Sequence, residues 1–107
     1  MVVVIASYRA RLGLEESLEA ALLEHVPALR RENLATSRTA WVLRAPKSNF
    51  YMEIFEWVSE EAVQRAHTIE SIQRIWSSLE RCAEFSTLAT CPESAKQFPH
   101  FELVCTT

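Results

Sequence analysis

The side chains best suited to chemistry lie on one aromatic and acidic segment and on a histidine that follows it. Residues 50–64 carry Tyr51, Glu53 and Trp57 at two-residue spacing, and His67 comes shortly afterwards. Residues at this spacing share one face of a β-strand. Histidine can serve as acid or base near neutral pH, and a carboxylate beside it can orient its ring. We therefore predict His67 and Glu53 as the catalytic candidates.

Other aromatic and polar side chains could complete a binding site around these two residues. Tyrosine and tryptophan join a large apolar ring to a single polar atom, so they can line a cavity and still donate a hydrogen bond. The predicted substrate-binding residues are Trp57, Trp76, Tyr8, Tyr51, Arg38 and His100.

Several of these candidates also have a purely structural interpretation. His67 would end a helix, where the helix dipole favours a histidine. Trp76 falls on an apolar helical stripe that could simply pack in the core. His100 could lie on the surface or in a subunit interface. Each residue type is therefore compatible with both a functional and a structural role.

Glu53 and Glu56 impose a constraint on the strand that carries them. They lie three residues apart and point to opposite faces, so at least one of them must be buried. A buried carboxylate needs a partner, most simply Arg38, Arg44 or His67. The paired carboxylate is a functional candidate, although a structural ion pair would satisfy the same constraint.

The strand expected over residues 50–57 requires cover on both faces. Aromatic and apolar residues fall on both of its sides, whereas a sheet wetted on one side would alternate apolar and polar residues. In a chain of 107 residues, one layer of helices can cover one face. We expect a second copy of the chain to cover the other.

The apolar pattern predicts further elements on either side of this strand. A helix with apolar residues every three or four positions should bend or break at Pro27. Ser59 and Thr68 are each placed to cap a helix that follows them. The expected elements are a strand at 2–9, a helix at 14–33, a strand at 36–44, a turn at 45–49, helices at about 60–67 and 69–83, a strand at 85–90 and an extended segment at 98–104.

This order of elements predicts one α+β domain over residues 1–107. It is the order of a ferredoxin-like, four-stranded antiparallel sheet with its helices on one face. The opposite, apolar face would be an interaction surface. Two such sheets packed face to face across a twofold axis would bury it, so we predict a homodimer.

Composition argues against several classes of partner and cofactor. The net charge is −3 and the basic residues are scattered, which does not favour nucleic-acid binding. No apolar run reaches the roughly 20 residues of a membrane span. The N-terminal apolar run is too short for a secretory signal, so a cytoplasmic location is expected. A single glycine leaves no glycine-rich phosphate loop.

The cysteines and histidines do not have the spacing of a metal or disulfide framework. Cys82, Cys91 and Cys105 are odd in number and far apart, which indicates reduced thiols. The three histidines fall on different expected elements, so no metal site is predicted.

The chain resembles the dimeric α/β-barrel superfamily, and within it the antibiotic biosynthesis monooxygenase-like domains. The resemblance rests on the opening strand at residues 2–8, Gly13, the glutamate-rich first helix, and the segment 51–62 with His67 after it. It covers most of the chain up to about Trp76. It implies a dimeric barrel in which two sheets face each other.

The same resemblance implies an activity that uses neither a metal nor a flavin. Such a monooxygenase deprotonates a phenolic or quinol-like substrate so that the substrate reacts directly with oxygen, and it needs an apolar cavity, a base and oxyanion donors. His67 would be the base, and Glu53 would orient it if the two residues meet.

Two other functions remain open. The first is a non-catalytic dimeric module that binds a ligand or stabilises a partner. The second is haem binding or degradation, which needs an axial histidine. His67 and Trp76 lie nine residues apart and would point in opposite directions on one continuous helix, although a break near Thr68 would remove that objection.

Overall fold

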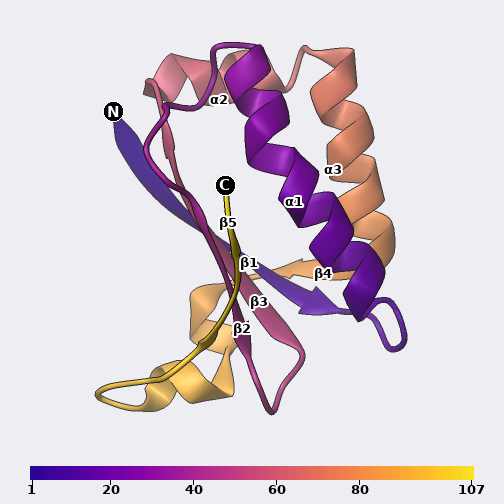
Figure 1. Ribbon diagram of the computed structural model, residues 1–107, viewed down its shortest axis with the longest axis vertical. Helices are drawn as coiled ribbons and strands as arrows, with labels where there is room; N and C mark the ends of the chain where they lie inside the picture. Colours follow the sequence, from indigo (N-terminus) through magenta and orange to yellow (C-terminus); the bar gives the residue numbers. More distant parts are fainter.

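Five antiparallel strands form one sheet in the order β4-β1-β3-β2-β5, with three helices packed beside it (Figure 1). The computed structural model describes residues 1–107. The α+β class and the antiparallel sheet are confirmed, but the sheet has five strands where four were predicted. The elements in chain order are β1 (Val2–Ala10), α1 (Glu15–Arg31), β2 (Trp41–Ala45), β3 (Phe50–Trp57), α2 (Glu60–Ala66), α3 (Glu70–Cys82), β4 (Ala83–Ser86) and β5 (Glu102–Thr106).

Strand β3 lies at the centre of the sheet. It pairs with β1 from Val2 opposite Trp57 to Arg9 opposite Phe50, and with β2 on its other side. Alternate residues of β3 therefore face the helices, as the two-residue period predicts. Tyr51, Phe55 and Trp57 are buried on that side.

The long helix α1 buries one stripe against the sheet and against α3. Leu18, Leu22 and Leu29 are fully buried on this stripe, while glutamates occupy the first turn and arginines the last. That charge order is favourable for the helix dipole. The helix continues through Pro27, so of the two predicted alternatives, a bend or a break into two helices, the break does not occur.

Two separate helices, α2 and α3, follow the central strand. The side chain of Ser59 accepts a hydrogen bond from the Ala62 amide and caps α2 as predicted. Thr68 does not cap α3, because the N-cap residue is Ile69 and the Thr68 hydroxyl donates backwards to the Arg65 carbonyl. The chain therefore turns between α2 and α3.

The remaining differences from the predicted elements concern strand limits. Residues 36–40 are not in a strand. A bridge between Ala35 and Trp57 and the hydrogen bond from the Thr36 amide to the Glu56 carbonyl tie this loop to the sheet. The last two strands also fall elsewhere than predicted, with β4 starting two residues earlier and β5 shifted towards the C-terminus. The fifth strand pairs with β2, and this pairing depends on contacts that local sequence patterns do not encode.

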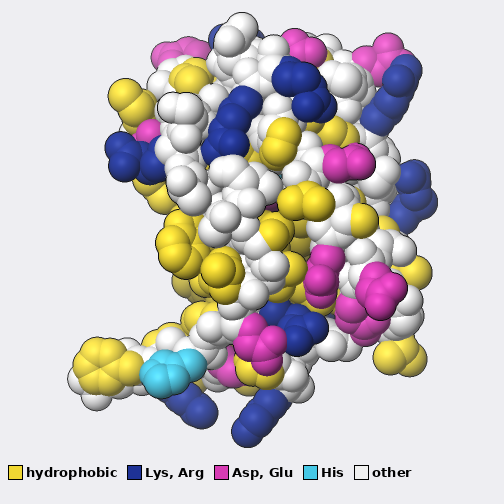
Figure 2. Space-filling view, in the orientation of Figure 1, with side chains coloured by type: hydrophobic (Ala, Val, Ile, Leu, Met, Phe, Trp, Pro, Cys, Tyr) yellow, Lys and Arg dark blue, Asp and Glu magenta, His cyan; other side chains and the backbone are white.

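The face of the sheet opposite the helices is only partly covered. Residues 87–101, including the short 3-10 turns η1 (Leu88–Thr90) and η2 (Pro92–Ala95), cross one end of it. Phe50 and Met52 are buried there with Cys91. The rest of this face, hereafter the open face, exposes Val3, Ile5, Trp41 and Leu103. Hydrophobic side chains also gather at the surface in the space-filling view (Figure 2).

None of the three helices has the length and apolar content that crossing a bilayer requires.

Two neighbouring leucines of α1 provide a test of this packing. Leu22 is fully buried, whereas Leu23 is 51% exposed. We expect Leu22→Ala to lower the free energy of unfolding by about 2–5 kcal/mol, because it leaves a cavity in the core. Leu23→Ala should change it by less than about 0.5 kcal/mol. Urea denaturation of both variants measures the difference, and equal losses would contradict the observed helix orientation.

Candidate functional site

A cavity of about 350 Å³ lies between β1 and the helices α2 and α3. Only residues Ser7–Ala10 of β1 pair with β4, so the first half of β1 is an open sheet edge at this place. The size and the largely apolar lining are typical of small-molecule sites. The lining residues are Val4, Ile5, Ala6, Ser7, Tyr8, His25, Phe55, Trp57, His67, Trp76, Leu79, Phe85 and Ser86.

A chain of buried hydrogen bonds forms the polar part of the cavity wall. The Nδ1 atom of His25 lies 2.8 Å from Oε1 and 3.1 Å from Oε2 of Glu53. The Tyr8 hydroxyl donates to Glu53 Oε1 at 3.2 Å, and the Trp76 indole N–H donates to His25 Nε2 at 2.9 Å. Four different elements, β1, α1, β3 and α3, thus contribute to one network.

These contacts define the protonation pattern of the His25 ring. An indole nitrogen can only donate, so the Nε2 atom that it approaches carries no proton. The proton of the neutral ring is then on Nδ1, where the Glu53 carboxylate accepts it. Glu53 thus accepts two hydrogen bonds, one from His25 and one from Tyr8.

The environment of Tyr8 keeps its hydroxyl protonated. Burial raises the pKa of Tyr8 well above its usual value, and the adjacent carboxylate of Glu53 raises it further through charge repulsion and the hydrogen bond. Tyr8 therefore acts as a hydrogen-bond donor to Glu53 at any physiological pH.

His67 and Trp76 meet on one side of the cavity. Their rings are 4.9 Å apart between centroids, in an edge-to-face arrangement. This contact is possible because the chain turns between α2 and α3, so the opposite orientation expected on one continuous helix does not apply. His67 is exposed at the end of α2. It contacts Trp76, and Glu53 pairs with His25 instead.

Trp57 joins the site through aromatic contacts. Its ring is 5.1 Å from that of Phe55, which in turn is 5.7 Å from the ring of His25. Of the predicted residues, Glu53, Tyr8, Trp57, Trp76 and His67 are therefore brought together around one cavity or its hydrogen-bonded wall.

The hydroxyl of Tyr51 belongs to a different group of polar side chains on the same side of the sheet. Its hydroxyl donates to Glu19 at 2.6 Å, and Arg44 bonds Glu102 at 2.7 Å beside it. Burial, followed by the hydrogen bond to Glu19, raises the pKa of Tyr51 to about 12. Tyr51 does not line the cavity described above.

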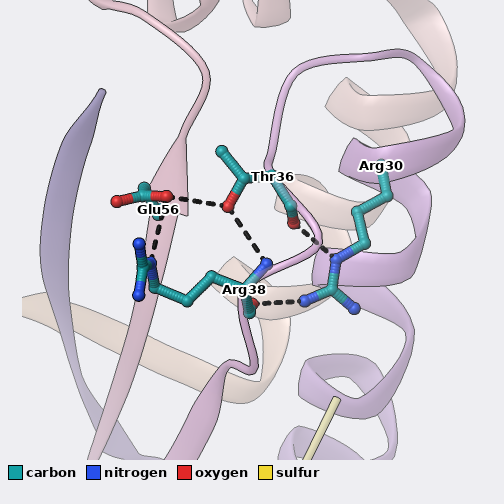
Figure 3. Close-up of polar contacts among 4 residues, drawn as sticks. All are labelled: Arg30, Thr36, Arg38 and Glu56. Atoms are coloured by element: carbon teal, nitrogen blue, oxygen red, sulfur yellow. Dashed lines mark hydrogen bonds and ion pairs between the residues drawn. The ribbon is translucent and has the colours of Figure 1, made fainter.

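Arg38 lies in the loop before β2 and pairs with Glu56 (Figure 3). Its Nε atom is 3.2 Å from Glu56 Oε1, which also accepts a hydrogen bond from the Thr36 hydroxyl at 3.0 Å. Arg30 donates to the carbonyl oxygens of Thr36 and Arg38, both at 2.8 Å. These bonds fasten the loop to α1 and β3, away from the cavity lining.

His100 lies in the segment that leads to β5. It borders a separate hollow of about 280 Å³, with Lys47, Glu93 and Phe98 among its neighbours. Tyr51, Arg38 and His100 therefore lie in three different places, none of them on the cavity lining. Their substrate-binding roles stay predictions.

A larger hollow of about 550 Å³ lies at the other end of β1. Charged and polar side chains, including Arg9, Arg11, Glu80 and Glu84, make up most of its lining. The two arginines already donate to backbone carbonyl oxygens of Thr90 and Glu80. We prefer the smaller cavity as the candidate site, because it combines an apolar lining with buried polar groups.

His25 is the residue of this site that the sequence did not identify. From the sequence it is only one of three histidines whose spacing does not suit a metal site. The signal that could have revealed it is its position on the buried stripe of α1, since Leu18, Leu22, His25 and Leu29 follow helical spacing. A histidine on such a stripe needs buried hydrogen-bond partners.

No group of three histidine, cysteine, aspartate or glutamate side chains lies in an arrangement that could hold a metal ion.

The chain was compared with protein-family models and with curated proteins, and neither comparison found a match.

The Glu56 contacts predict a pH-dependent contribution to stability. The Thr36 hydroxyl lowers the pKa of Glu56 below its usual value, and Arg38 adds to this, against the opposing effect of burial. A depressed folded-state pKa stabilises the fold above the unfolded-state value of about 4.3. That stabilisation disappears as the pH falls through the folded-state pKa.

We expect Glu56→Gln to be less stable than the wild type at pH 7, with the difference vanishing in acid below the folded-state pKa. Urea midpoints measured from pH 7 to pH 3, at one protein concentration, give the comparison. Glu24→Gln, at an exposed position of α1, is the control and should follow the wild-type curve. A difference for Glu56→Gln that stays constant with pH would contradict the charge-based explanation.

Proposed function

We propose that this protein binds an apolar, aromatic small molecule in the cavity between β1 and the helices α2 and α3. The observation that carries the proposal is the combination of an apolar lining with the buried His25 on the wall, which is paired with Glu53 behind it. Apolar walls supply affinity for a ring, and a few fixed polar groups supply orientation. Aromatic side chains around the space favour a planar ligand.

The more specific proposal is cofactor-independent oxidation of a phenolic or quinol-like metabolite, as in the monooxygenase-like domains that the sequence resembles. This chemistry needs a proton acceptor and hydrogen-bond donors beside an apolar space. Histidine rings and an indole N–H border the cavity, and a buried carboxylate stands behind them.

A non-catalytic ligand-binding or structural module is the alternative. One observation favours it: the Trp76 N–H and both nitrogens of His25 already have partners within the protein. A network satisfied in this way can serve to fix the positions of α1 and α3 alone. The two functions differ in whether an added ligand changes this network.

The assembly that we propose is a homodimer with a ferredoxin-like core. The strand order β4-β1-β3-β2 follows that arrangement, with β5 added at one edge. The open face supports a dimer, because Val3, Ile5, Trp41 and Leu103 expose apolar surface on the same side of β1, β2 and β5. A second copy packed across a twofold axis would remove this surface from water.

Filling the cavity tests the proposed binding site. Ala6 lines it and is half-buried, so Ala6→Phe should occupy the space that a ligand ring needs. Isothermal titration calorimetry with naphthols and quinols should show binding to the wild type and its loss in the variant, and an oxygen electrode would reveal any oxidation. Ala89→Phe, at an exposed position, is the matched control. Equal binding by both variants would place the ligand elsewhere.

A charge on the open face tests the proposed dimer. Trp41 is 46% exposed there and lies outside the cavity. We expect Trp41→Lys to convert a dimer to a monomer, since burying an unpaired ammonium group is costly. Sedimentation equilibrium measures the mass in solution. Leu12→Lys, in the turn before α1, is the control and should leave the mass unchanged, and a wild type that is already monomeric would refute the proposal.

A further inference from the structure

His25 is the buried titratable group whose surroundings are best arranged for proton transfer. It is only 3% exposed, and Glu53 behind it is fully buried. The only ion pair that Glu53 makes is with His25. Tyr8 adds a neutral hydrogen bond and no positive charge. The carboxylate therefore has no permanent cation as a partner.

This arrangement favours the arrival of a proton at His25. A buried carboxylate without a cation is unfavourable, and an imidazolium beside it converts a lone charge into an ion pair. The Nδ1 atom already carries its proton towards Glu53, so the vacant position is Nε2. A histidine oriented by a carboxylate in this way is the arrangement that activates hydroxyl groups in many hydrolases.

One group alone blocks that vacant position. The Trp76 indole N–H occupies Nε2 of His25 at 2.9 Å. The indole also meets the ring of His67, an exposed residue at the end of α2, and it packs against the edges of the two buried apolar clusters. Trp76 itself is only partly buried, so a rotation of its side chain can free Nε2 towards the cavity that both residues line.

We propose that His25 accepts the proton of a phenol or enol hydroxyl bound in this cavity, while the Trp76 N–H transfers its hydrogen bond from His25 to the resulting anion. This inference rests on the proposed binding function and makes His25, rather than His67, the base. The O–H bond of the ligand breaks, the proton forms an N–H bond at Nε2, and the electron pair stays on the ligand oxygen.

The charges balance in this step without any oxidant or cofactor. Before it, the site holds a carboxylate and a neutral ligand. After it, the site holds the ion pair of His25 and Glu53 together with a ligand anion that the indole N–H stabilises. The ligand class follows from this balance: a planar, apolar molecule with one weakly acidic hydroxyl group.

The probe 4-nitrophenol tests the proposal, because its phenolate absorbs at a longer wavelength than the phenol. With the wild type, we expect the ratio of phenolate to phenol of the bound probe to exceed that of the free probe by about tenfold at the same pH, which equals one pKa unit. With His25→Gln, which can keep hydrogen bonds to both neighbours, the ratio should fall below that of free probe, because an apolar cavity disfavours the anion. Glu24→Gln, at an exposed position of the same helix and outside the cavity lining, serves as the control and should leave the ratio unchanged.

A second measurement makes the test independent of how the variant folds. Nitrogen NMR of wild-type protein with labelled histidines should show one ring becoming an imidazolium when the probe binds. Assignment of that ring to His67, or a bound probe that is no more ionised than the free probe, would overturn the role of His25 and leave the binding function intact. Failure of 4-nitrophenol and of larger nitronaphthols to bind at all would overturn both.

Discussion

The burial of one carboxylate on the central strand is the constraint on which the rest of this structure depends. Glu53 has no exposed surface, and β3 is flanked by β1 and β2. Water cannot reach the carboxylate, so protein donors must replace it. Tyr8 supplies one from the neighbouring strand, and His25 supplies the other from α1. The helix can therefore lie on the sheet in only one register, the one that brings its histidine to this carboxylate.

The network also links the two parts of the helix-side core. One apolar cluster contains Leu22 and Tyr51, and the other contains Val26 and Phe55. His25 falls between the two clusters along α1, and Glu53 falls between them along β3. A buried polar group that is fully satisfied fixes position more sharply than apolar contacts, which tolerate sliding. Trp76 extends this effect to α3 by its bond to His25. Four side chains thus fix the relative positions of four elements, β1, α1, β3 and α3.

The sequence was sufficient to predict what local periodicity controls. The central strand, the buried stripe of α1, the Ser59 cap and the paired state of Glu53 all follow from spacing and residue type. Arg38, Arg44 and His67 are the partners that the sequence predicts for a buried carboxylate on this strand, and Arg38 does pair with Glu56. The partner of Glu53 is His25 instead, because residue spacing does not show which helix crosses β3 at this point. The same limit applies to β5, whose pairing with β2 is non-local. His67 and Trp76 can meet because the chain turns between α2 and α3. The sequence predicts a helix boundary there from a Thr68 cap, but Thr68 does not cap α3.

Strand β1 connects the candidate site with the open face. Its alternate residues Val4, Ala6 and Tyr8 point to the helix side, while Val3 and Ile5 are exposed on the other. Only its second half is held by β4, so the first half depends on β3 alone. Any partner on the open face would support this half of the strand. Because Tyr8 donates to Glu53 from the same strand, burial of the open face and the geometry of the carboxylate network are physically linked through β1.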